Sequence, residues 1–173
     1  SIFWKLRFLL DNLPAWFHPV GFERHRHDNF LLLQNPETGA SITGEGGDNM
    51  GRGGRSSLYF IDEWAFVERA EAVNAAVSQN SNVVIKGSTP NGVGNLFYVE
   101  RFSGRFPVFT FNWRDNPDKN HYELNANGEK VYPWYERQKL NLDPLTLAQE
   151  VDINYAASAE GVLIPGEWVQ AAI

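Results

Sequence analysis

The sequence predicts an α/β fold built around a mainly parallel sheet. After residue 57, short apolar runs typical of buried strands alternate with longer segments of helical periodicity. Alternation at these lengths is typical of βαβ units, which bury a parallel sheet under helices on both faces. Two of the predicted strands also end in polar clusters, and the carboxyl ends of the strands are where such sheets bind ligands.

The part of the chain before this alternation is predicted to form a helix and a hairpin. Residues 1–12 have apolar side chains at roughly helical spacing and stop before the first proline, which predicts a helix. A polar connection follows at 19–29. The turn sequence at 35–39 then predicts that a short strand at 30–34 pairs back with 40–44.

The later alternation is predicted to contain three strands and two helices, and a further helix is expected near the end. Each strand is an apolar or β-branched run, and each helix has an apolar face. In chain order the elements are a strand at 58–61, a helix at 66–79, a strand at 82–88, a helix at 94–102 and a strand at 106–113. Asp143 and Pro144 then supply the cap and the first turn of a helix at 142–151.

Composition and charge limit the possible classes of protein only broadly. The chain has 173 residues, no cysteine and a net charge of −6. This length fits one domain with a real core, and the lack of cysteine excludes disulfides and thiolate metal sites. Nucleic-acid-binding domains are usually basic, so an acidic chain is a poor candidate for holding a duplex by charge alone. No segment approaches the roughly 20 apolar residues of a membrane span, and the start does not resemble a signal peptide.

The polar cluster after the first strand of the alternation is a pair of carboxylates, Asp62 and Glu63. Phosphoryl transfer from a nucleotide uses such a pair, because one carboxylate orients Mg²⁺ and the other orients and deprotonates the attacking water. Asp62 is the candidate for the metal role, through the water shell of the ion, and Glu63 is the candidate for the base. The alternative is that Asp62 only caps the helix that follows.

The second cluster ends the next strand and is predicted to lie on the same edge of the sheet. Ser88, Thr89 and Asn91 offer hydroxyl and amide groups suited to sensing a γ-phosphate or its attacking water. The sequence TPNG is also an ordinary tight turn. Both clusters together, separated by one helix, favour a functional site over two unrelated turns.

A Gly- and Arg-rich segment at 44–55 precedes the first of these strands and predicts no regular element. Its glycines allow close approach to phosphates, and Arg52 and Arg55 are candidates for stabilising transition-state charge as an arginine finger does. A flexible, solvated surface loop is the alternative. The phosphate-cradling motif GxxxxGK[ST] does not occur in the chain.

Weaker signals leave other readings open. The basic run at 24–27 suggests a metal or DNA contact, although a solvated surface is the commoner role of such a run. Residues 113–115 fit either a nucleotide-base contact or simple packing. A two-metal nuclease or phosphohydrolase using Asp62, Glu63 and Asp115 is a second enzyme class. It is disfavoured because neighbouring side chains on a strand point to opposite faces, unless the strand ends before Asp62. A non-catalytic interaction module is a third class.

At these residues the sequence resembles the large subunit of tailed-phage or prophage terminases, the motor that packages DNA into procapsids. The resemblance rests on the stretches GRGGRSSLYFIDEWAF, GSTPNGVGNLFY and AQEVDINYAASAEGVLIP, and it covers nearly the whole chain in the expected order. It implies a three-layer P-loop NTPase-like fold of the RecA/ASCE type, with a mainly parallel sheet, truncated before the P-loop.

The resemblance also implies roles for individual residues. Asp62 and Glu63 correspond to the Walker B carboxylate and the catalytic glutamate of the family. Residues 88–92 correspond to the coupling motif, which links hydrolysis to movement. Arg52 stands where family members carry an arginine proposed to act on the nucleotide of a neighbouring subunit, and Arg55 is the competing choice.

Cofactors and partners follow from the same resemblance. The implied cofactors are ATP and Mg²⁺ in the full-length protein. The implied partners are double-stranded DNA, the portal protein, the terminase small subunit and further copies in a ring, without a membrane partner. The implied location is the cytoplasm of the bacterial host. Residues 1–160 are then expected to be the C-terminal portion of the ATPase domain, and 161–173 the start of a linker toward a nuclease domain. Without a P-loop, these 173 residues alone are expected to bind ATP poorly and not to turn it over.

Overall fold

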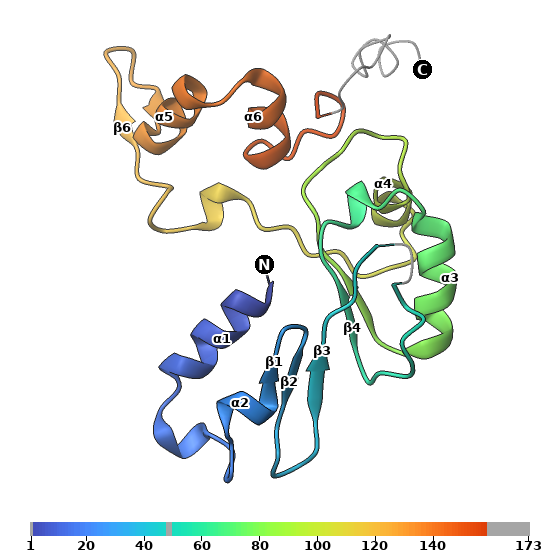
Figure 1. Ribbon diagram of the computed structural model, residues 1–173. Helices are drawn as coiled ribbons and strands as arrows, with labels where there is room; N and C mark the ends of the chain where they lie inside the picture. The colour runs from blue at the N-terminus through green and yellow to red at the C-terminus, as the bar shows by residue number, and fades with distance from the viewer. Residues whose placement is uncertain (1, 48–49, 159–173) are drawn as a thin grey trace. The chain divides into compact units, whose positions relative to one another are not determined.

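The computed structural model describes residues 2–47 and 50–158 and is mixed helix and sheet (Figure 1). Its sheets are small, and one of them is a parallel pair. The chain divides into two compact units, Ser1–Arg55 and Ser56–Ile173. In the described part, no helix combines the length and the apolar character needed to cross a membrane. The predicted linker at 161–173 lies outside the described residues.

The first unit combines a helix with an antiparallel sheet. Helix α1 (Ile2–Asn12) confirms the helix predicted at 1–12. The predicted hairpin is also present, with Leu33 opposite Ile42. The strands pair in the order β1 (Asp28–Asn29), β2 (Leu32–Gln34), β3 (Ser41–Thr43).

The connection at 19–29 is more ordered than predicted. It contains the one-turn helix α2 (Arg24–His27) and ends in strand β1, and a short 3-10 turn, η1 (Ala15–Phe17), precedes it. Glu23 and Arg26 form an ion pair of 3.2 Å, and ion pairs at this spacing support a helical turn. The polar side chains that made the segment resemble a loop are therefore the ones that stabilise its single turn.

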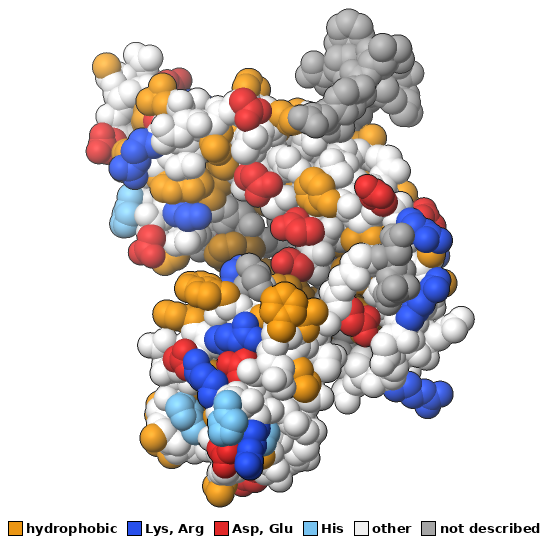
Figure 2. Space-filling view, in the orientation of Figure 1, with side chains coloured by type: hydrophobic (Ala, Val, Ile, Leu, Met, Phe, Trp, Pro, Cys, Tyr) orange, Lys and Arg blue, Asp and Glu red, His pale blue; other side chains and the backbone are white. Residues whose placement is uncertain are grey.

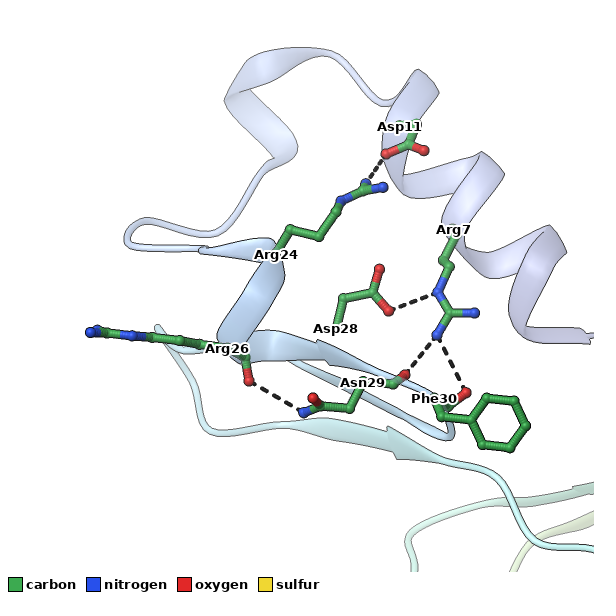
Figure 3. A network of polar contacts seen from close by, with 7 residues as sticks. All are labelled: Arg7, Asp11, Arg24, Arg26, Asp28, Asn29 and Phe30. Atoms are coloured by element: carbon green, nitrogen blue, oxygen red, sulfur yellow. Dashed lines mark hydrogen bonds and ion pairs between the residues drawn. The ribbon is translucent and has the colours of Figure 1, made fainter.

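Arg7 joins α1 to the sheet (Figure 3). Its Nε lies 2.7 Å from the carboxylate of Asp28, and its Nη2 donates to the carbonyl of Asn29 at 2.6 Å. The Asp28 side chain is only 4% exposed, and a buried carboxylate requires a charged partner of this kind. A second ion pair, between Arg24 and Asp11, links α2 to the same helix.

The second unit is built around a parallel strand pair. The strand pair and its helices are, in chain order, β4 (Tyr59–Ile61), α3 (Ala70–Asn80), β5 (Val84–Lys86) and α4 (Leu96–Phe102). The two strands pair in parallel, with Ile61 opposite Lys86. This βαβ unit confirms the parallel pairing predicted from the alternating sequence.

Helices cover one face of the strand pair. Ile61 is 3% exposed on this face. Its pairing partner Lys86 contacts Asn74 of α3 and Glu100 of α4. In Figure 1 both helices lie beside β4. Burial of the apolar face of α3 supplies much of the hydrophobic stabilisation here.

The opposite face of the strand pair is open in the part of the chain that the structure describes. Phe60 and Ile85 pair across the two strands on this face and are 49% and 47% exposed. The sequence predicted helices on both faces, and this second layer is not found among those residues. The three-layer P-loop NTPase-like fold stays a prediction.

The prediction of a strand at 106–113 is wrong. Residues 106–112 lie outside any helix or strand, and Trp113–Asp115 form the 3-10 turn η4. Phe109 and Phe111 are 85% and 61% exposed. The run has the composition of a strand, but a strand also needs a neighbour to pair with its backbone groups, and no described strand pairs with it.

A hairpin and a helix follow that were not predicted. They are β6 (Glu123–Leu124), β7 (Lys130–Val131) and α5 (Pro133–Asn141). Trp113 is buried against them, stacked on Tyr135 with ring centroids 5.2 Å apart and edge-on to Tyr132 at the same distance. Of the two roles considered for residues 113–115, packing describes Trp113.

Helix α6 (Pro144–Glu150) confirms the predicted helix and its cap. The Asp143 carboxylate accepts hydrogen bonds from the backbone and the hydroxyl of Thr146, at 3.0 and 2.6 Å. These bonds, the one from the hydroxyl foremost, lower the pKa of Asp143. Because the folded-state pKa is depressed, the stabilisation is present above the ordinary Asp pKa and is lost as the pH falls through the lowered value.

Two helical valines test the assigned packing. Val77 on α3 is 1% exposed, whereas Val99 on α4 is 52% exposed. We expect Val77→Ala to lower the free energy of unfolding by about 2 kcal/mol, because it removes buried methyl groups and leaves a cavity. Val99→Ala makes the same chemical change on a helix surface and should alter it by less than about 0.5 kcal/mol. Urea unfolding measures both values, and equal effects would contradict this packing.

Candidate functional site

The parallel pair brings the two predicted polar clusters to the same edge of the sheet. Ile61, the last residue of β4, lies opposite Lys86, the last residue of β5. Two backbone hydrogen bonds continue the contact beyond the strands: Gly87 N–H donates to Ile61 at 2.9 Å, and Trp64 N–H donates to Gly87 at 3.0 Å. The loop after β4 therefore starts in direct contact with the loop after β5.

The acidic pair lies just outside the strand and is exposed. Strand β4 ends at Ile61, so Asp62 and Glu63 both belong to the loop. Glu63 adopts the left-handed conformation, with φ 55° and ψ 41°, and the 3-10 turn η3 (Trp64–Phe66) begins directly after it. The argument that two neighbours on a strand point to opposite faces therefore does not apply to this pair.

The structure does not support the helix-capping alternative for Asp62. The N-cap residue of η3 is Glu63, and the N-cap residue of α3 is Arg69. Helix α3 begins at Ala70, eight residues after Asp62. Asp62 is thus an exposed carboxylate at the sheet edge that caps neither helical segment.

The side chains of Ser88 and Asn91 hold the two loops together. Ser88 Oγ accepts a hydrogen bond from the backbone N–H of Ala65 at 3.1 Å. Asn91 Nδ2 donates to the carbonyl of the same residue at 3.0 Å. Two of the three predicted phosphate-sensing side chains therefore contact the segment that follows the acidic pair, and a role in sensing a γ-phosphate stays a prediction.

The same loop also contacts the end of the described chain. Thr89 Oγ1 donates to Glu150 of α6 at 3.2 Å, and Gly92 N–H donates to Ser158 Oγ at 3.0 Å. Ser158 is 2% exposed. The loop after β5 thus touches both the acidic loop and the segment that follows α6. The resemblance to a terminase included this segment up to residue 165, and its last seven residues lie outside the described part of the chain.

The two candidate arginines belong to the first unit, whereas the acidic pair belongs to the second. The segment around Arg52 folds around a carboxylate, because Gly51 N–H donates to Glu45 Oε2 at 2.7 Å. A Cβ on Gly53 would lie 2.0 Å from the other oxygen of Glu45, so a larger residue there would require the Glu45 side chain to move. The arginine-finger role of Arg52, or of Arg55, stays a prediction.

The basic run at 24–27 is paired with nearby acids. Arg26 and His25 both contact the carboxylate of Glu23, at 3.2 and 3.5 Å, and Arg24 pairs with Asp11. Figure 2 shows basic and histidine side chains close together with acidic ones, where α2 lies in Figure 1. These contacts agree with the commoner role of such a run, a solvated surface, and a metal or DNA contact stays a prediction.

The residues present fit a singly held magnesium ion better than a two-metal centre. Residues 2–47 and 50–158 contain no group of three or more His, Cys, Asp or Glu placed to hold a metal ion. The third carboxylate considered for two-metal chemistry, Asp115, accepts a hydrogen bond from Asn112 N–H at 2.9 Å and so caps η4. Mg²⁺ usually keeps several waters and needs only one or two carboxylates beside the phosphates of its substrate. The exposed Asp62 matches that requirement.

A buried network beside the acidic pair was not predicted from the sequence. Glu100 of α4 accepts a hydrogen bond from the indole of Trp64 at 2.8 Å and forms an ion pair of 2.5 Å with Lys86. The one available signal was Lys86 itself, a charged residue that closes an apolar strand and so requires a partner. Its partner lies 14 residues away in sequence, on a helix whose pattern indicates only packing.

In comparisons with known proteins, no family model matches the chain, and no curated protein or solved structure matches it either.

Ser88 provides a test of the contact between the loops. We expect Ser88→Ala to lower the free energy of unfolding by about 1 kcal/mol, because the amide of Ala65 loses its acceptor. Ser88→Thr keeps the hydroxyl and should preserve the bond. Amide exchange at Ala65 should be roughly fivefold faster in Ser88→Ala.

Thr89→Ala is the control for this change, because the hydroxyl of Thr89 bonds to Glu150 at the exposed surface. It should change stability by less than about 0.5 kcal/mol. Unchanged exchange at Ala65 in Ser88→Ala would mean that the two loops are not joined through this hydroxyl.

Proposed function

We propose that this chain forms part of the ATP-hydrolysing motor of a terminase large subunit, which packages double-stranded DNA into procapsids. One observation carries the proposal: the acidic pair and the loop at 87–92 share one edge of a parallel strand pair, and hydrogen bonds from residues on either side of the acidic pair join the two loops there. Such an edge is where parallel α/β sheets bind ligands. Two of the three sequence stretches that resemble terminases contain these two loops.

In this proposal Asp62 orients Mg²⁺, and Glu63 orients and deprotonates the water that attacks the γ-phosphate. The magnesium ion supplies charge neutralisation on the β- and γ-phosphates when it is bound. Both carboxylates are exposed at the sheet edge and therefore accessible to a nucleotide. A phosphate-binding loop, which has no counterpart in these 173 residues, would be supplied by another segment.

In this proposal the loop at 87–92 couples ATP hydrolysis to movement. This loop contacts the acidic loop through Ser88 and Asn91. It contacts the last residue of α6 through Thr89 and the segment after α6 through Gly92. A change at the nucleotide would therefore reach the region after α6 through one short segment. The proposed partners are double-stranded DNA, the portal protein, the terminase small subunit and further copies of the chain in a ring, in the host cytoplasm. Arg52 or Arg55 would act on the nucleotide of a neighbouring copy.

The decisive test is Glu63→Gln in a polypeptide that joins this chain to a segment with a phosphate-binding loop. We expect ATP turnover to fall by about 10²- to 10⁴-fold, because the general base is lost. ATP binding should be retained, because the amide has the same size and Asp62 is intact. Steady-state hydrolysis and equilibrium nucleotide binding measure the two effects.

Glu68→Gln is the matched control, since Glu68 is an exposed glutamate shortly after the acidic pair. It should leave turnover unchanged. Retained turnover in Glu63→Gln would contradict the proposal. Manganese-dependent DNA cleavage by the 173-residue chain itself would instead favour the nuclease class.

A further inference from the structure

A buried ion pair lies directly behind the candidate site. Lys86 Nζ and Glu100 Oε1 are 2.5 Å apart, and their side chains are only 17% and 11% exposed. Lys86 also donates to Asn74 of α3 at 2.7 Å. Its ammonium lies 4.7 Å from the centre of the Trp64 ring, within the range of a cation–π contact.

Both oxygens of the Glu100 carboxylate are used. One accepts from the ammonium of Lys86, and the other accepts from the indole Nε1 of Trp64 at 2.8 Å. Burial of a charge is costly unless it is paired and its hydrogen-bonding capacity is filled. Here both conditions are met, by Lys86 at the end of β5 and by Trp64 in the turn η3.

The partners of Glu100 lie next to the two loops of the candidate site in the sequence. Trp64 directly follows the acidic pair, and Lys86 directly precedes the loop at 87–92. Trp64 is 1% exposed, and its backbone N–H also donates to Gly87. The residue after Glu63 is therefore held at its backbone by one loop and at its ring by α4.

We propose that Glu100 is a positioning residue for the candidate site. Its single carboxylate sets the acidic pair relative to the coupling loop, so that α4 and both loops move together. This inference rests on the proposed function for its catalytic consequence. The alternative is an ion pair that only stabilises the fold.

Three variants separate these alternatives. Glu100→Gln leaves one donor without an acceptor, and Lys86→Met leaves a buried carboxylate without its cation, so each should destabilise the chain. The double variant Lys86→Met/Glu100→Gln removes both charges while keeping similar volumes, and it should regain most of the stability. An ion pair that only stabilises the fold predicts full recovery of every property in the double variant.

A positioning role predicts that the double variant recovers its urea midpoint but not the contact between the loops, because the amide can still accept from Trp64 but the link from position 100 to position 86 is lost. The amides of Trp64 and Ala65, which bond to the second loop, should exchange about tenfold faster than in the unchanged chain. The amide of Ser81, which bonds to Val77 at the end of α3, should not change. Exchange measured by NMR on the 173-residue chain gives this result without any catalysis.

The catalytic consequence is measured in the polypeptide that carries a phosphate-binding loop. There kcat for ATP should fall about tenfold in the double variant while KM changes little, because the general base is misplaced but the nucleotide contacts remain. The same pair of substitutions at Lys139 and Glu136, an exposed ion pair on α5, is the matched control. It should change neither exchange nor kcat.

Full recovery of exchange rates and kcat in the double variant would overturn the positioning role. An unchanged urea midpoint in Glu100→Gln would also overturn it, because the contacts of the carboxylate with Lys86 and Trp64 would then contribute nothing to stability. If the unchanged polypeptide fails to hydrolyse ATP, the proposed function falls, and the exchange rates at Trp64 and Ala65 still decide the positioning role.

Discussion

The parallel pairing of β4 with β5 is the constraint on which the rest of the site depends. Parallel strands end at the same edge, so Asp62 and Gly87 follow paired residues and their loops start side by side. The hydrogen bonds from Gly87 to Ile61 and from Trp64 to Gly87 extend this contact past the last strand residues. An antiparallel pair would place the two loops at opposite ends of the sheet. Helix α3 makes the parallel arrangement possible, because such strands need a long crossover connection.

Polar groups around this edge divide into supporting and exposed ones. Ser88 and Asn91 fill the hydrogen-bonding needs of Ala65, and Glu100 fills those of Trp64 and Lys86. The two carboxylates of the acidic pair are exposed instead. Catalytic groups act best when residues behind them fix their geometry in advance. This arrangement provides such support, because the buried contacts flank the acidic pair in sequence and hold the residue that follows it.

Local patterns in the sequence predicted the elements that local forces determine. Helix α1, the β2–β3 hairpin, the βαβ unit and α6 follow from periodicity, turn residues and the Asp143 cap. The failures depend on partners distant in sequence. The run at 106–113 has strand composition, but no strand in the described part of the chain pairs with it. Residues 24–27 form a helical turn through ion pairs that a loop composition does not indicate.

The position of the candidate site was predictable from the sequence, but the contacts within it were not. Its two loops were found because both follow apolar strands, and their shared edge followed from the parallel pairing. The contacts that join the loops were not predictable, because they depend on where side chains such as Ser88 and Glu100 point after folding. A capping role for Asp62 was a reasonable alternative by composition alone. It failed because the chain makes the turn η3 before α3 begins.

The backbone at Glu63 adopts an uncommon conformation that depends on the buried contacts beside it. A left-handed conformation at a residue other than glycine costs on the order of 1 kcal/mol, and glycine or asparagine would fit the turn better. The conformation persists because the next residue, Trp64, is buried and hydrogen-bonded at both its backbone and its ring. The chain accepts the same cost at Ile153, where φ is 54°. At Glu63 the buried neighbours fix an uncommon backbone conformation at the edge of a parallel sheet, which is where the proposed function places a carboxylate.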